Sequence, residues 1–377
     1  MTPGGAGVAQ RHLDPMDPAT GSPAADVLPD YLRAQATEFL RALRAHREAG
    51  SNGGAPARSR PAAGTGAAGG RAPGTGDHGG EDTADAVLAL RRSARRISGT
   101  LHTFRPLLDA AWSEHIRPEL AWLSGTLARE HAYAARLERL VAALNRLSGA
   151  AAFPTQPRGT AQSAGDATAK GSLTVGAAKA GALLDRQLTL ARTRAHSAAL
   201  QALGSSRFHA VADSVAVLAS EVPLAPAAAG AELRPLADAA HERLCDAVAA
   251  LPLVTAGLPY NAEALVHGLS PDPAPHPQDA PWHQVRLLLR LYRYSREVLH
   301  GRDTLDDVRL LAAGEALNRH RDASEAAAAA ASAARTPRIA PATAYALGVL
   351  HADQRHEVEA ARFAFQQCWQ KEAVSTA

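Results

Sequence analysis

This sequence of 377 residues has only two cysteines, no long apolar run and no strong excess of one charge. Its two cysteines, Cys245 and Cys368, have no second cysteine nearby, which excludes a Cys-x-x-Cys redox motif, a thiolate zinc cluster and a disulfide framework. Lysine and arginine number 40 against 37 aspartates and glutamates, so the formal net charge is only +3. This net charge is too small for the whole surface to attract polyanions, so any electrostatic function must depend on a local group of charges.

Targeting signals are also missing. No segment approaches about 18 uninterrupted apolar residues. The N-terminus holds Pro3, Gly4 and Gly5 where a signal peptide would need a basic stretch followed by an apolar run. We therefore expect a cytoplasmic protein without a membrane segment.

Aromatic residues make up only 4% of the chain, whereas hydrophobic residues make up 46%, a share enlarged by alanine. Alanine is the best helix former and fills little core volume, so this composition indicates helices packed closely through small side chains. No segment shows a convincing alternation of apolar and polar residues between hairpin turns. The sequence predicts an all-α protein, and its length allows one large domain or two modest ones.

Stretches rich in Gly, Ala, Pro, Ser and Thr divide the chain, because such stretches cannot repay their ordering entropy by burial. We expect a disordered tail over 1–23, a first helical half over 24–148 with a disordered insertion at about 51–81, a low-complexity linker over 149–175, and a second helical half over 176–374. Apolar residues at helical spacing predict helices over about 27–50, 83–104, 107–125, 130–147, 177–204, 206–220, 231–250, 280–299, 304–334 and 341–374.

The helix expected over 83–104 carries a basic stripe. Four arginines occupy six positions with no acidic residue among them: Arg91, Arg92, Arg95 and Arg96. At about 100° per residue, Arg91, Arg95 and His102 lie on one side, while the apolar residues occupy a separate face. A solvated charged face is the simplest alternative, but such faces normally interleave Glu or Asp for i,i+4 pairing.

The helix expected over 280–299 repeats this arrangement. His283, Arg286, Arg290 and Arg293 fall within about 80° of one another on a helical wheel. Arg286 and Arg290 stand 195 residues after Arg91 and Arg95, which is compatible with an internal duplication. A duplicated helical bundle, with two pseudo-symmetric halves of the four-helix type, would follow from it.

Rows of arginine about one helical turn apart suit an extended polyanion. Guanidinium groups present rigid donor forks to phosphate oxygens, and histidines near the row add charge as the pH falls below about 6.5. Linear polyphosphate fits such a row, and DNA or RNA would offer the same phosphates. Nucleic acid is disfavoured, because aromatic stacking platforms and Lys-rich tails are scarce.

Other candidate sites are weaker. His241 and Cys245 stand at i and i+4, but two ligands do not make a metal site. The triplet starting at His320 mimics a kinase catalytic motif but has neither a glycine loop nor a downstream metal-binding pattern. Glu357 and Glu359 lack the paired carboxylate rows that metal-dependent hydrolysis needs. We therefore expect no catalytic residues, no metal and no cofactor.

The first basic stripe also lies in a motif of a known family. Val87 to Ser98 reads V-L-A-L-R-R-S-A-R-R-I-S, and Thr103 begins the run T-F-R-P-L-L. This resembles the V-H-x-x-R-V-x-x-R-R-L-R and T-F-R-P-L-L segments of the CHAD family, the conserved histidine α-helical domain. Leu88 stands in place of the family's histidine, Ser98 in place of an arginine, and Ala132 in place of an aspartate.

The second half of the chain matches the family more closely. Arg194-Ala195-His196 and Ser206-Arg207-Phe208 are similar to its R-A-H and S-x-R-[YF] steps, and His283 begins a match to its H-x-x-R-x-x-x-[KR]-x-x-R-Y helix. Leu317 to Ala323 resembles the L-G-x-H-x-D-A step, with asparagine replacing glycine. The resemblance spans about 24–374.

The resemblance implies a helical domain of two bundle halves that binds inorganic polyphosphate without catalysis, and association with polyphosphate granules is a further expectation. The principal contacts would be Arg91, Arg95, Arg96, His283, Arg286, Arg290 and Arg293. Second-rank contacts would be His102, Arg194, His196 and Arg321. Two alternatives stay open. One is a diverged helical scaffold for a protein partner, which the replaced family residues motivate, and the other is a general binder of polyanions or nucleic acid.

Overall fold

The computed structural model describes residues 24–53, 78–149, 164–258, 276–301 and 307–370. Its regular structure in these ranges is helical, with one isolated bridge between Leu108 and Leu224. The helices are α1 (Ala24–Gly53), α2 (His78–Thr103), α3 (Ala110–Leu147), α4 (Ala164–Leu203), α5 (Ser206–Ser220), α6 (Arg234–Ala249), α7 (Leu253–Ala256), α9 (Ala280–His300), α10 (Val308–Ala334) and α11 (Pro341–Gln370). The expected all-α fold is confirmed.

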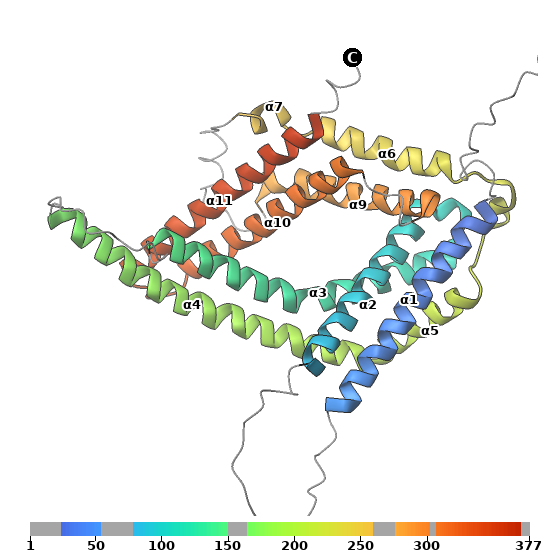
Figure 1. Ribbon diagram of the computed structural model, residues 1–377, viewed down its shortest axis with the longest axis horizontal. Coiled ribbons are helices and arrows are strands. Elements are labelled where there is room, and N and C mark those ends of the chain that lie inside the picture. The colour runs from blue at the N-terminus through green and yellow to red at the C-terminus, as the bar shows by residue number, and fades with distance from the viewer. Residues whose placement is uncertain (1–23, 54–77, 150–163, 259–275, 302–306, 371–377) are drawn as a thin grey trace, which may run out of the picture.

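Two helix boundaries differ from the sequence-based expectations. The helices expected over 107–125 and 130–147 form one continuous helix, α3. Its start is capped by Asp109, whose carboxylate accepts the backbone N–H of Trp112 at 2.7 Å. Gly125 does not interrupt it, because α3 is held along its length by α2 and then α4 (Figure 1).

Helix α4 begins at Ala164, inside the range expected to be a linker. Alanine favours the helix, and close packing against α11 supports it, since a Cβ on Gly176 would lie 2.3 Å from the carbonyl oxygen of Ala342. The tail over 1–23 and most of the insertion, residues 54–77, lie outside the described residues.

The buried side chains form three apolar cores. The first joins α1, α2, the first part of α3, and α5. The second joins the end of α3, the middle of α4, and the facing parts of α10 and α11, largely through alanine. The third lies among α6, α9, α10 and Phe365 of α11. Packing through small side chains is thus confirmed in the second core.

Helices from both sides of the linker expected at 149–175 contribute to the same cores. Helices α3 and α4 lie side by side across the molecule (Figure 1), and Phe208 and Val215 of α5 belong to the first core. The domain boundaries expected from the sequence stay a prediction, because composition marks a low-complexity stretch but not which helices pack across it. No helix in the described ranges has a stretch long and apolar enough to cross a membrane.

Helices α2 and α9 cross at Gly99, and this crossing positions both basic stripes. A Cβ on Gly99 would lie only 2.6 Å from Cδ2 of Tyr294. We expect Gly99→Ala to lower the free energy of unfolding by about 1–3 kcal/mol, because either the tyrosine or the helix must shift. Urea unfolding measures this change.

Gly125→Ala is the matched control, because nothing lies within 4 Å of the Cβ it would add to α3. Its expected effect is a gain of about 0.5–1 kcal/mol from higher helix propensity. Equal effects of the two substitutions would show that the crossing does not depend on a glycine.

Candidate functional site

Arginines from three helices converge beside the crossing of α2 and α9. We call Arg91 and Arg95 of α2, Arg286 and Arg290 of α9, and Arg321 of α10 the arginine cluster. Burial lowers the pKa of Arg95 to about 10, and the charges of Arg91 and Arg290 add to the shift. Burial also lowers the pKa of Arg286 to about 9, helped by Arg321, Arg290 and Arg95. These guanidinium groups lie close enough to repel one another.

Four members of the arginine cluster have no carboxylate partner among the described residues. In the ranges that the structure describes, no ion pair joins Arg91, Arg95, Arg286 or Arg290 to an acidic side chain. Arg286 donates through Nε to the amide oxygen of Asn318 at 2.8 Å, which is a neutral acceptor. Gathering positive charges with few counter-charges costs free energy, and the nearby charge of Asp322 offsets this only in part at Arg286.

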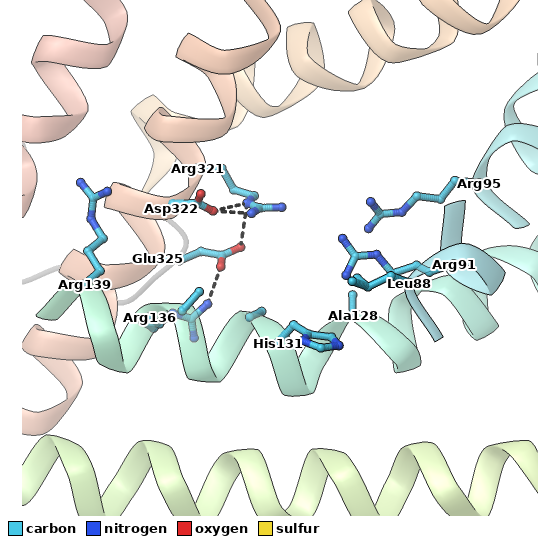
Figure 2. A pocket seen from close by; sticks show the side chains of 12 residues that line it. Leu88, Arg91, Arg95, Ala128, His131, Arg136, Arg139, Arg321, Asp322 and Glu325 are labelled. Carbon is cyan, nitrogen blue, oxygen red and sulfur yellow. Dashed lines mark hydrogen bonds and ion pairs between the residues drawn. The ribbon is translucent and has the colours of Figure 1, made fainter. Parts of the chain in front are cut away.

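A pocket of about 380 Å³ opens next to the cluster. Three helices surround it: α2 supplies one side, α3 the floor and α10 the opposite side (Figure 2). The guanidinium groups of Arg91 and Arg95 point across it toward that of Arg321 (Figure 2). Its lining consists of Leu88, Arg91, Arg95, Ala128, His131, Ala132, Ala135, Arg136, Arg139, Arg321, Asp322 and Glu325.

Ion pairs occupy the α3 and α10 side of this pocket. Arg321 donates through Nε to Asp322 at 2.9 Å, and its Nε lies 4.0 Å from Glu325. Arg136 of α3 pairs with Glu325 of α10. The pocket therefore has one side with unpaired arginines and one side with paired arginines.

The family model for the CHAD domain matches residues 75–331, more than half of the chain. The chain belongs to the CHAD family. Among solved structures, it is similar to PptA from Streptomyces chartreusis, with 65% sequence identity and a TM-score of 0.71 over 93% of this chain and 100% of that chain. No curated protein matches. The family resemblance seen in the sequence is thus confirmed.

The CHAD domain brings together five of the residues predicted to bind phosphate: Arg91, Arg95, Arg286, Arg290 and Arg321. His283 is half-buried beside them, with its ring edge-on to His320 at 5.4 Å between centroids. Burial lowers the pKa of His283. Arg293 is half-buried beside α10, near Gly314.

The other predicted residues lie elsewhere in the CHAD domain. Arg96 donates to Glu297 of α9 at 2.7 Å, and Tyr31 donates to the same carboxylate at 2.9 Å. This buried carboxylate holds Arg96 in the helix crossing and away from the pocket. His102 is exposed beside Arg117, with 3.2 Å between their nitrogens.

On α4, Arg194 is exposed and His196 contacts Glu130 of α3 at 2.9 Å. Neither residue lines the pocket. The structure therefore does not bring these two residues together with the arginine cluster.

The sequence analysis missed three basic residues of α3 that line the pocket: His131, Arg136 and Arg139. The available signal was the i,i+3 spacing of Arg136 and Arg139. Glu138 between them gave this helix the mixed charge of an ordinary solvated face. Their function depends on which helix faces them, which no local pattern reveals.

A buried charge network fixes the beginning of α9 and hence Arg286. Asp279 accepts hydrogen bonds from Arg355 at 2.8 Å and from Arg362 at 2.7 Å, both on α11. His320 of α10 lies 3.6 Å from the same carboxylate, and burial, followed by the charge of Arg362, lowers its pKa to about 3, so this imidazole is neutral at physiological pH. The network ties α9, α10 and α11 together behind the cluster.

Proposed function

We propose that this CHAD domain binds inorganic polyphosphate at the arginine cluster and the adjoining pocket. The observation that carries the proposal is the convergence of Arg91, Arg95, Arg286 and Arg290 from two helices without a carboxylate partner in the described part of the chain. A polyanion would relieve their mutual repulsion. Membership of the CHAD family supports phosphate as the ligand, because the family resemblance implies polyphosphate binding.

The dimensions of the pocket favour a single phosphate chain over nucleic acid. A space of about 380 Å³ between three helices admits an extended chain but not a DNA duplex, whose major groove alone is about 12 Å wide. None of the residues that line it is Phe, Tyr or Trp, so it lacks the platforms on which single-stranded bases stack. Binding to polyphosphate would also place the protein on polyphosphate granules.

Titration of the purified protein with long-chain polyphosphate at near-physiological salt tests the proposal. Duplex DNA at a matched phosphate concentration is the control. We expect tight binding that prefers polyphosphate and weakens steeply with added salt, because counterions compete for the chain. No binding, or equally weak binding to both polymers, would contradict the proposal and favour a scaffold for a protein partner.

A further inference from the structure

Two carboxylates lie inside the pocket, among the arginines that face a ligand. Glu325 of α10 reaches across to Arg136 of α3, and Asp322 contacts Arg321 on its own helix (Figure 2). These negative charges would repel a phosphate chain bound in the pocket. Their position therefore affects which anions the pocket binds.

The exposure of these side chains shows which partner can leave. The side chain of Glu325 is 42% exposed, whereas that of its partner Arg136 is only 17% exposed. Asp322 is likewise more exposed than Arg321, at 46% against 29%. The carboxylates can therefore turn outward into water while the guanidinium groups stay in the pocket.

We propose that Glu325 is a tethered competitor for polyphosphate, displaced only by a chain already anchored at the unpaired arginines. This inference rests on the proposed function. The carboxylate of Glu325 is attached to the protein beside Arg136, so its effective concentration there is high. A short anion free in solution therefore displaces it only weakly. A chain anchored at Arg91 and Arg95 delivers its next phosphates at a comparable effective concentration, and so it can take over Arg136 and Arg321. Glu325 thereby makes the side of the pocket formed by α3 and α10 selective for long chains.

A purely structural role for Glu325 predicts a different outcome. If the ion pair of Glu325 and Arg136 only holds α3 and α10 together, replacing either residue removes the same interaction. Both variants would then change binding in the same direction. Under the competitor role the two changes have opposite signs, because one removes the competitor and the other removes a phosphate contact.

The experiment compares Glu325→Gln and Arg136→Gln in titrations with tripolyphosphate and with long-chain polyphosphate. We expect Glu325→Gln to bind the long chain roughly tenfold more tightly, which is the effect of removing one charge near the bound phosphates. Tripolyphosphate, which fits on the unpaired arginines alone, is expected to change by less than about twofold. Arg136→Gln is expected to bind the long chain more weakly.

Glu315→Gln is the matched control, because Glu315 is exposed on the same helix and does not line the pocket. It is expected to leave both affinities unchanged, and thermal unfolding of each variant verifies that it folds. Equal tightening for both ligands, or changes of the same sign in Glu325→Gln and Arg136→Gln, would overturn the competitor role. If the wild type binds neither ligand, the proposed function itself fails. If the wild type binds and Glu325→Gln behaves like it, only the competitor role fails.

Discussion

Replacing Arg286 and Arg290 together by glutamate is expected to weaken polyphosphate binding by at least about a hundredfold while leaving the helix content unchanged. Each charge-assisted contact to phosphate contributes roughly 1.5–3 kcal/mol, so two lost contacts account for that factor before any repulsion is added. Arg286 lies among Arg95, Arg290 and Arg321, whose charges lower its pKa in addition to burial. The reversal therefore places negative charge among the remaining arginines of the cluster. Titration and circular dichroism measure the two outcomes.

The control reverses two exposed basic residues far from the pocket lining. Lys179→Glu with Arg186→Glu on α4 makes the same change in net charge. It is expected to reduce the affinity only slightly, through the screened field of the whole protein. If the α9 variant binds as tightly as the wild type, α9 is not part of the site.

Asp279→Asn is expected to lower the free energy of unfolding by about 3–5 kcal/mol, because it removes the charge that Arg355 and Arg362 share, after which Arg362 keeps only Glu359 at 2.7 Å. The side chains of Arg355 and Asp279 are each only 3% exposed, and that of Arg362 is 5% exposed. Both arginines are therefore shielded from water in the folded protein. Urea unfolding at neutral pH measures the loss.

Asp185→Asn on the exposed face of α4 removes the same charge and is expected to change the free energy of unfolding by less than about 0.5 kcal/mol. A similar loss in both variants would mean that the buried network contributes nothing specific. The arginine cluster should also be disturbed in Asp279→Asn, since Arg286 follows Asp279 by two helical turns and depends on the same helix start.

The effect of Asp279 also has a defined pH dependence. Burial by itself would raise the pKa of this carboxyl, but the hydrogen bond from Arg355 and the charges of Arg355, His320 and Arg362 outweigh it, so the pKa is lowered below its ordinary value of 3.8. A group with a lowered pKa stabilises the fold above its unfolded pKa and loses that contribution as the pH falls through its folded pKa. The difference between wild type and Asp279→Asn should therefore be complete at neutral pH and shrink only below about pH 4.

Local patterns predicted most helices because helix formation depends on neighbouring residues. Apolar residues at helical spacing predicted helices over 206–220, 280–299 and 304–334. These agree with α5, α9 and α10 within a few residues. The same reasoning failed between 125 and 130, where a break was expected but α3 is continuous and packs against α2 and α4. It failed again at Ala164, where α4 begins inside a stretch whose composition indicated a linker.

The arginine stripes also show what local sequence can and cannot predict. The fold brings together Arg91, Arg95, Arg286 and Arg290, which lack interleaved acids in the sequence. Their role in binding and the internal duplication suggested by their spacing stay predictions. Arg96 carries the same local signal, yet its partner Glu297 is 201 residues away in sequence. Conversely, Arg136 carries no distinctive signal and still lines the pocket.

The residues alone determined the helical class, the family and the existence of two basic helix faces, because each of these follows from composition, periodicity or short motifs. Only the tertiary structure decided which basic residues converge beside the pocket and which are neutralised by a carboxylate. Charge pairing depends on distances between side chains on different helices, and those distances arise from how the three apolar cores pack. The carboxylate of Glu325 beside Arg136, 189 residues away in the chain, is such a pairing.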